Sequence, residues 1–244
     1  MDILAEYTSP NWNRRPSRAE IDTVILHYTG MKTGEEALQR LCDPVAEVSA
    51  HYLIEEDGRL FQLVAEENRA WHAGVSHWQG RENLNHSSIG IELVNPGHEF
   101  GYKPFPPAQI ETLLCLLDAI KQRHKIPGSR FLGHSDIAPA RKTDPGHLFP
   151  WAALATEGFG VFSDKDGRDQ TVMLRHGDSG PSAINLNKQL GIIGYHGCYC
   201  DSIEQSTVQA LKAFQTHWRS GLVNGVLDKG TSWVLEDIVQ KITA

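Results

Sequence analysis

The chain has 244 residues and a mass of 27.2 kDa, which allows one large domain or a medium one with a small companion. With 40% apolar and 22% charged residues it is typical of globular proteins, which excludes collagen-like, disordered and coiled-coil classes. No apolar run reaches the roughly 18 residues of a membrane span, and a net charge of -7 argues against a nucleic-acid partner.

The first part of the chain carries the signals of a mixed β-sheet. Apolar or alternating runs predict strands at residues 21–27, 48–54, 59–64, 88–94 and 130–134. The second and third runs are joined through Asp57-Gly58, a dipeptide that accepts positive φ, and therefore predict a hairpin. In the fourth run, Gly90 and Glu92 share the face opposite Ile89 and Ile91.

A helix is expected from Pro107 to about His124, since proline suits the first turn and apolar residues recur at helical spacing. Strands separated by helices, with one antiparallel hairpin, predict an α/β fold: a mixed central β-sheet flanked by helices. Cys42 and Cys115 fall among apolar helical positions, so we expect both to be buried thiols. That cysteine usage favours a reducing compartment.

The last third of the chain is helical in pattern. Apolar periodicity predicts three short helices over about 182–190, 206–218 and 231–242, which together make a small all-α domain. The polar, glycine-containing stretch before them has no sustained period and is typical of a linker. We therefore predict a first domain over 1–155, a linker over 156–171 and a three-helix domain over 172–244.

Two strand-terminal histidines and one aspartate could bind a metal. His27 and His134 each follow a short apolar strand, and Asp144 lies in a proline-flanked loop. Two imidazoles and a carboxylate are the donor set of a catalytic zinc site, which leaves a fourth position open for water. Each residue also has a structural explanation: strand-end histidines are often hydrogen-bonded core residues, and an aspartate before proline is often a turn former.

Glu92 and Lys142 could do the chemistry beside such a metal. Burying an unpaired carboxylate in the middle of an apolar strand is costly, so Glu92 should have a partner. Glu92 could take a proton from a metal-bound water. Lys142, two residues before Asp144, could stabilise the oxyanion that forms when hydroxide adds to an amide. The alternatives are a solvated strand face for Glu92 and a solvated loop cation for Lys142.

Aromatic and imidazole groups at loop or strand-edge positions suit a sugar- or peptide-binding surface. Candidates are His51, Trp71 and His72, each of which could instead serve in packing.

Five spaced segments resemble the zinc-dependent type 2 N-acetylmuramoyl-L-alanine amidases, the AmpD- and AmiD-like group. They are VILHYTG (24–30), SAHYLIEEDG (49–58), RAWHAGVSHWQGREN (69–83), SIGIELVNPG (88–97) and GHSDIAPARKTDPG (133–146). The resemblance implies a mixed sheet flanked by helices, with Zn²⁺ bound by His27, His134 and Asp144. It also implies Glu92 as general base and Lys142 as the oxyanion-stabilising cation.

The resemblance further implies substrate-binding roles. Trp71 and His72 resemble cleft residues of the group, and Arg141 resembles a position that holds the acidic stem peptide, while His51 stays a substrate-binding candidate from its residue type. Tyr28 stands where relatives often have asparagine, so substrate contacts there are expected to differ.

The activity implied is hydrolysis of the amide bond between N-acetylmuramic acid, or its 1,6-anhydro form, and L-alanine. The expected partner is peptidoglycan or a muropeptide. One alternative is a non-catalytic peptidoglycan-binding sensor of the same fold, and another is a metal-dependent endopeptidase on the same scaffold.

Residues 172–240 resemble a three-helix peptidoglycan-binding domain, from which Cys198 and Cys200 depart. The start of the chain shows no export signal, so the sequence favours the cytoplasm, with the periplasm or cell envelope as the alternative.

Overall fold

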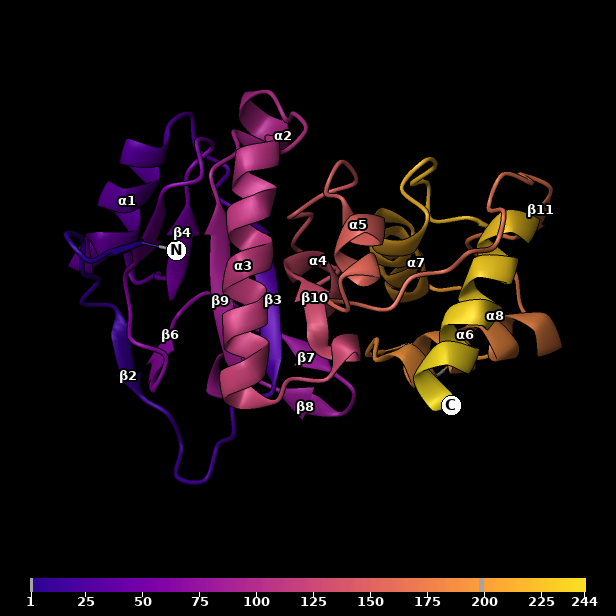
Figure 1. The fold of residues 1–244 in the computed structure, drawn as a ribbon. Helices are drawn as coiled ribbons and strands as arrows, with labels where there is room; N and C mark the ends of the chain where they lie inside the picture. The colour runs from indigo at the N-terminus through magenta and orange to yellow at the C-terminus, as the bar shows by residue number, and fades with distance from the viewer. Residues whose placement is uncertain (1, 198–199) are drawn as a thin grey trace.

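The computed structural model describes residues 2–197 and 200–244, so Cys198, singled out from the sequence, lies outside the described residues. Its centre is a six-stranded mixed sheet in the order β1-β5-β4-β9-β3-β10 (Figure 1). The strands of this sheet are β1 (Ile3–Leu4), β3 (Thr23–Tyr28), β4 (Tyr52–Ile54), β5 (Leu60–Gln62), β9 (Ser88–Leu93) and β10 (Phe131–Gly133). β4 and β5 form the expected hairpin, and β4, β9, β3 and β10 run parallel.

One face of the sheet is covered by the long helix α3 (Pro107–His124), which crosses it in the foreground of Figure 1. Alternate strand residues such as Leu26 and Ile91 meet the helix side chains Leu113 and Leu117 in one buried cluster. The remaining short elements on this part of the chain are β2 (Trp12–Arg14), β6 (Asn68–Ala70), β7 (His77–Trp78), β8 (Arg81–Glu82), α2 (Gly97–Phe100) and α5 (Trp151–Thr156), and the 3₁₀ turns Pro44–Ala46, Leu84–His86 and Gly128–Arg130.

The opposite face is covered in two places. Helix α1 (Gly34–Cys42) packs Leu38 and Leu41 against Leu53 of β4 and Phe61 of β5. At the other side of the sheet, α4 (His134–Ile137) and the C-terminal helices pack against β3 and β10. Part of β9 and the end of β3 therefore lie between two covered regions, with α1 at the left and the C-terminal helices at the right of Figure 1.

The C-terminal region contains the three expected helices, α6 (Pro181–Ile193), α7 (Gln205–Trp218) and α8 (Lys229–Thr243). It also contains a short antiparallel pair that the sequence did not predict, β11 (Val172–Leu174) with β12 (Leu227–Asp228). Leu190, Phe214 and Leu235 of the helices share one buried cluster with Ile25 of β3 and Leu132 of β10. The helices and the sheet thus have a common core.

The stretch expected to be a linker contacts both regions. Phe159 is buried in the cluster beneath α3, and the carbonyl of Val161 accepts a hydrogen bond of 2.7 Å from the indole of Trp218. The division into domains at 155 and 172 stays a prediction.

A second link between the two regions is the carboxylate of Asp136 in α4, which is 1% exposed. It accepts hydrogen bonds from the backbone of Gly133 at 2.7 Å and from Tyr195 at 3.0 Å, and it lies 2.7 Å from Nδ1 of His217 in α7. The His217 ring is stacked between Trp151 and Trp218, with centroids 3.7 and 3.8 Å away. This network joins the segment that follows β10 to the C-terminal helices.

The α/β fold class is confirmed, and the strand and helix predictions agree with the structure to within a few residues. The prediction for Cys115 is wrong: its side chain is exposed, and Cys42 is half-buried. The buried side of α3 contains Leu113, Leu116 and Leu117. Cys115 follows Leu113 by two residues and therefore points about 200° away from it around the helix axis. Within the described residues, no helix combines the length and apolarity needed to cross a bilayer.

Candidate active site

The sheet brings the candidate residues together at the uncovered part of its face. His27 and Glu92 are direct neighbours in the parallel pairing of β3 with β9, so both side chains project from the same face. Gly133, the last residue of β10, pairs with Leu26, which places His134 beside the end of β3. Asp144 reaches the same point from the loop after α4. A hydrogen bond of 2.9 Å from the Ser135 amide, at the start of α4, to the Asp144 carbonyl fixes this part of the loop.

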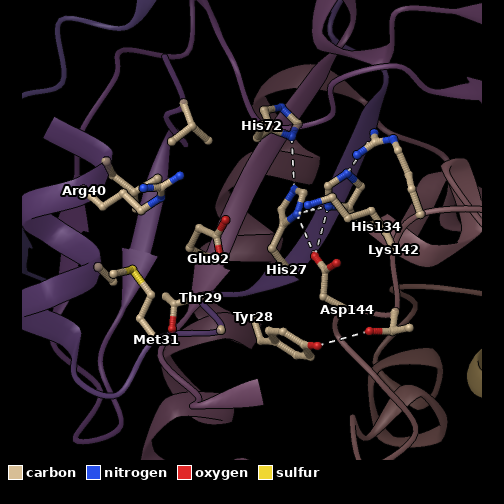
Figure 2. A pocket seen from close by; sticks show the side chains of 16 residues that line it. His27, Tyr28, Thr29, Met31, Arg40, His72, Glu92, His134, Lys142 and Asp144 are labelled. Carbon is tan, nitrogen blue, oxygen red and sulfur yellow. Dashed lines mark hydrogen bonds and ion pairs between the residues drawn. The ribbon is translucent and has the colours of Figure 1, made fainter. Parts of the chain in front are cut away.

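Three side-chain atoms converge although their residues lie up to 117 positions apart. Nδ1 of His27 lies 2.9 Å from Nδ1 of His134 and 3.0 Å from Oδ2 of Asp144, and the third side of the triangle is 3.1 Å (Figure 2). All three residues are buried. Among the residues that the structure describes, this is the one group of three or more potential ligands close enough to hold a metal ion.

The electrostatics favour the ligating forms of His27 and Asp144. Burial and the neighbouring His134 lower the pKa of His27 to about 4, so its imidazole is neutral near pH 7. Burial opposes ionisation of Asp144, but the adjacent His134 and His27 outweigh it and hold the pKa of this carboxyl well below its usual range. A neutral imidazole and a carboxylate are the protonation states that divalent metals bind.

The geometry of the triangle fits a tetrahedral ion. Zinc bonds of about 2.0–2.1 Å at tetrahedral angles separate neighbouring ligand atoms by about 3.3 Å, close to the 2.9–3.1 Å seen here. Nε2 of His134 lies 3.1 Å from the carbonyl of Ala73, which can only accept, so the proton of this ring is on Nε2 and Nδ1 is free to ligate.

A cavity of about 390 Å³ opens beside the triangle. Glu92 lines it, and its Oε2 is buried without a hydrogen-bond partner, so a polar group or water in the cavity could satisfy it. Burial and the charge of Asp144 raise the pKa of Glu92 well above its usual value, against an opposing effect of Lys142. Lys142 lines the same cavity (Figure 2).

The other residues expected to bind substrate lie in different places. Tyr28 lines the cavity, and its hydroxyl lies 2.9 Å from Nδ1 of His98 and 3.1 Å from Oγ1 of Thr143. Arg141 also lines it, but its guanidinium donates to the carbonyls of Ala73 and Val75 through Nε and Nη2. Nη1 is the one guanidinium nitrogen of Arg141 that donates no hydrogen bond to a carbonyl of the described residues.

His72 lies at the inner wall, where its ring nitrogens contact His27 and Ser88. His51 is completely buried: its Nδ1 accepts from the Gly90 amide, and its Nε2 lies 3.0 Å from Arg15. The half-exposed Trp71 donates its indole N–H to Asn13 at 3.3 Å. Neither His51 nor Trp71 is a lining residue of the cavity.

Helix α1 contributes a wall of the cavity that was not predicted from the sequence. Arg40, in the last turn of this helix, lines the cavity together with Met31 and Leu41, on the side of Glu92 away from the histidines (Figure 2). No ion pair or hydrogen bond joins its guanidinium to the rest of the described chain, although Glu36 lies one helical turn away. A basic residue near a helix end is typical of solvated surface, so no sequence pattern indicates this role.

Comparison with known proteins identifies the family. Residues 17–147, more than half of the chain, match the family described as N-acetylmuramoyl-L-alanine amidase. AmiD of Escherichia coli K12 is 35% identical over 243 residues, which cover 93% of this chain and 87% of AmiD. The anhydro-N-acetylmuramyl-L-alanine amidase AmpD of Haemophilus influenzae is 39% identical over 161 residues, covering 59% of this chain and 85% of AmpD.

Solved structures agree. The complex of E. coli AmiD with anhydro-N-acetylmuramic acid-L-Ala-D-γ-Glu-L-Lys superposes with a TM-score of 0.75 at 34% identity, covering 93% of each chain. AmpDh3 of Pseudomonas aeruginosa, in complex with anhydromuramic pentapeptide, gives a TM-score of 0.78 at 32% identity over 97% of this chain and 98% of AmpDh3. The family match and the near full-length similarity to AmiD show that this chain belongs to the N-acetylmuramoyl-L-alanine amidases, enzymes that hydrolyse the amide bond between N-acetylmuramic acid and L-alanine.

Proposed function

We propose that the amidase is zinc-dependent and that His27, His134 and Asp144 hold the ion. The convergence of these three ligand atoms at the edge of a cavity that also contains an unpartnered Glu92 oxygen carries the proposal. When bound there, zinc polarises the scissile carbonyl and lowers the pKa of a water molecule towards ~7.

Within this proposal Glu92 is the proton carrier. Its side chain projects from the strand next to His27, and its free Oε2 can accept the proton of the attacking water and return it to the leaving amine. Lys142 supplies a fixed positive charge for the oxygen that becomes negative when the amide carbon turns tetrahedral. Its ammonium strengthens binding of the transition state relative to the ground state.

We propose anhydro-muropeptides as the substrate class. Two relatives that cover almost all of this chain were solved with an anhydromuramic acid peptide bound. Tyr28 and Arg141 line the cavity and could contact such a ligand. Trp71 would require a binding surface beyond the cavity, and His51 is completely buried.

A digestion experiment tests the proposal. Purified anhydro-N-acetylmuramoyl tripeptide is incubated with the enzyme, and the products are weighed by mass spectrometry. We expect free L-Ala-D-Glu-containing peptide and anhydro-N-acetylmuramic acid, loss of both after chelation, and recovery on adding zinc. Cleavage within the peptide would identify an endopeptidase instead, and binding without any product would identify a sensor.

Whether residues 172–244 bind peptidoglycan, as the sequence resemblance implies, is a proposal that a pull-down with purified sacculi tests. The full chain is expected to sediment with sacculi, and a fully soluble protein would contradict it.

The cytoplasmic location favoured by the sequence also stays a proposal. In the described residues Cys42, Cys115 and Cys200 are free thiols, which fits a reducing compartment. Cell fractionation tests it: recovery with the cytoplasmic fraction is expected, and recovery with the envelope would contradict it.

A further inference from the structure

A chain of hydrogen bonds leads away from the proposed metal site into the protein. Nε2 of His27, the ring nitrogen opposite the ligating one, lies 3.1 Å from Nδ1 of His72 (Figure 2). Nε2 of His72 lies 3.2 Å from the hydroxyl of Ser88, the first residue of β9. That hydroxyl donates to the backbone carbonyl of Leu84 at 2.5 Å.

The last link fixes the direction of all the others. A carbonyl oxygen only accepts, so the single hydroxyl proton of Ser88 points to Leu84, and the Ser88 oxygen must accept from Nε2–H of His72. A neutral His72 then has a bare Nδ1, which accepts from Nε2–H of His27. His27 is thereby left with an unprotonated Nδ1, the atom that meets His134 and Asp144.

A doubly protonated His72 would reverse this outcome, because it would donate at both nitrogens and push the proton of His27 onto Nδ1. The surroundings disfavour it. His72 is 5% exposed, its ring faces His27 and His51, and no hydrogen bond or ion pair joins it to a carboxylate in the described residues. Burying an unpaired charge in such a place is costly.

The backbone around His72 is built to seat this ring. A Cβ at Gly90 would come within 2.3 Å of Cγ of His72, so the ring fits against β9 only because residue 90 is glycine. The side-chain oxygen of Asn85 accepts from the amides of His72 and Ala73, which fixes the segment that carries the ring. The carbonyl of Ala73 in turn holds Nε2 of His134, so one short segment orients both ligand imidazoles.

We propose that His72 and Ser88 are positioning residues that set the tautomer of His27 and thereby preorganise Nδ1 for the metal. The proposal rests on the zinc site proposed above and extends it: His72 serves the metal ligand rather than the substrate. Partners that orient a ligating histidine typically contribute about 10- to 100-fold to metal affinity.

The first test reads the tautomer directly. Long-range ¹H–¹⁵N correlation spectra of the metal-free full-length protein distinguish a histidine protonated on Nε2 from one protonated on Nδ1. We expect the Nε2–H form for His27 and His72 in the wild type, and a mixture of both forms in Ser88→Ala. A wild-type His27 protonated on Nδ1 would overturn the proposal.

The second test measures zinc affinity by competition with a chromophoric chelator. His72→Phe keeps a ring but removes the acceptor, so we expect a 10- to 100-fold weaker affinity. His72→Asn can present its side-chain oxygen near the place of Nδ1 and should recover most of that loss, which a purely structural role would not explain.

Circular dichroism of the metal-free variants shows whether each one is folded, and Ser88→Ala, which removes one buried oxygen, provides a second variant if His72→Phe does not fold. A wild type that binds no zinc would refute the zinc site itself. The positioning role alone would be refuted if the wild type binds zinc and folded His72→Phe binds it with the same affinity. If His72→Phe does not fold, the same comparison is made with folded Ser88→Ala.

Discussion

Glu92 is the residue whose loss should separate turnover from metal binding. Glu92→Gln keeps the shape of the side chain but cannot take a proton, and general base catalysis typically contributes about 10²- to 10⁴-fold. We therefore expect hydrolysis of anhydro-N-acetylmuramoyl peptide to fall by at least about 100-fold, with zinc content unchanged. Peptide release measured by chromatography, with metal content as the control, tests this; near-normal turnover would exclude Glu92 as the base.

The same substitution should stabilise the metal-free protein at neutral pH. Burial and Asp144 raise the pKa of Glu92 in the folded state, so the folded protein binds this proton more tightly than the unfolded chain does. Stability from this group is complete below the unfolded pKa near 4.5 and is lost as pH rises towards the raised value. We expect metal-free Glu92→Gln to melt higher than wild type at pH 8 and alike at pH 4; a lower melting temperature at pH 8 would contradict this.

Gly90 offers a steric test of the His72 seat. The added methyl group of Gly90→Ala would overlap the His72 ring, which must then move away from His27. Zinc affinity should fall as it does in His72→Phe, while Gly221→Ala, where a Cβ meets nothing within 4 Å and the backbone, as at Gly90, has no positive φ, serves as the glycine control. An unchanged affinity in Gly90→Ala would show that the ring tolerates displacement.

For single residues, the sequence indicated which side chains could bind a metal better than it indicated which neighbours each side chain contacts. His27, His134 and Asp144 were found because strand ends and a rigid loop present ligands in a recognisable pattern, and the structure brings them together. His51 and His72 look alike in sequence, yet one is buried beside Arg15 and the other contacts the cavity. Which imidazole faces which neighbour depends on side-chain packing across strands, and no local spacing encodes that.

Among the elements, α1 forms one wall of the cavity beside Glu92. It places the unpaired Arg40 on the cavity wall, and the γ-linked glutamate in the peptide bound to E. coli AmiD retains a free α-carboxylate. If the present substrate binds in this cavity, Arg40→Gln should raise KM several-fold with little change in kcat, and Arg40→Lys should retain most of the affinity. Steady-state kinetics test this, and an equal loss for a substrate whose carboxylate is amidated would contradict a charge-based role.

The C-terminal end of helix α3 is tied to the sheet by the half-buried Glu66, which lies in the segment after β5. Glu66 contacts Arg123 at 2.6 Å, His124 at 2.6 Å and Tyr52 at 2.7 Å, and although burial opposes it, these hydrogen bonds lower the pKa of Glu66 to about 2. Because the folded pKa is depressed, the stabilisation is present above the unfolded pKa near 4.5 and is lost as pH falls towards 2.

Glu66→Gln should therefore unfold at a higher pH than wild type during acid titration, and it should lose stability at pH 7. Far-ultraviolet circular dichroism follows both effects. Glu111→Gln, in α3 and without an ion pair among the described residues, is the control. Identical acid transitions for Glu66→Gln and wild type would show that the ionised carboxylate contributes nothing.

The helices and strands were largely predictable because hydrophobic periodicity and the turn residues that end an element are local properties of the sequence. The run 107–124 and the hairpin through Asp57-Gly58 appear where the sequence places them. The order of strands and the placement of α1 over β4 and β5 were not predictable in this way, since they depend on contacts between distant segments. That is why the cavity wall at Arg40 was missed. The error at Cys115 has a local cause, because helical spacing alone places this residue about 200° from the buried Leu113.

For the molecule as a whole, the shared core predicts that the sheet and the C-terminal helices unfold together. Ile25 and Leu132 of the sheet lie in one cluster with the helices, and Asp136 joins them through Tyr195 and His217. Asp136→Ala would remove the carboxylate that accepts from Tyr195 and contacts His217, and removing the acceptor of a buried hydrogen bond costs about 1–3 kcal/mol. Calorimetry should show one transition in wild type and a much lower melting temperature in the variant; two separate transitions in wild type would contradict the shared core.

Asp136 stands two residues after the proposed ligand His134, and two of its hydrogen-bond partners, Tyr195 and His217, come from the C-terminal region. A substitution near residue 217 could therefore alter turnover from a distance, without touching any group that meets the substrate. Exchanging the C-terminal helices for those of another family member would then be a catalytic experiment as well as a binding one, and chimeras would need to inherit the histidine and tyrosine that face this carboxylate.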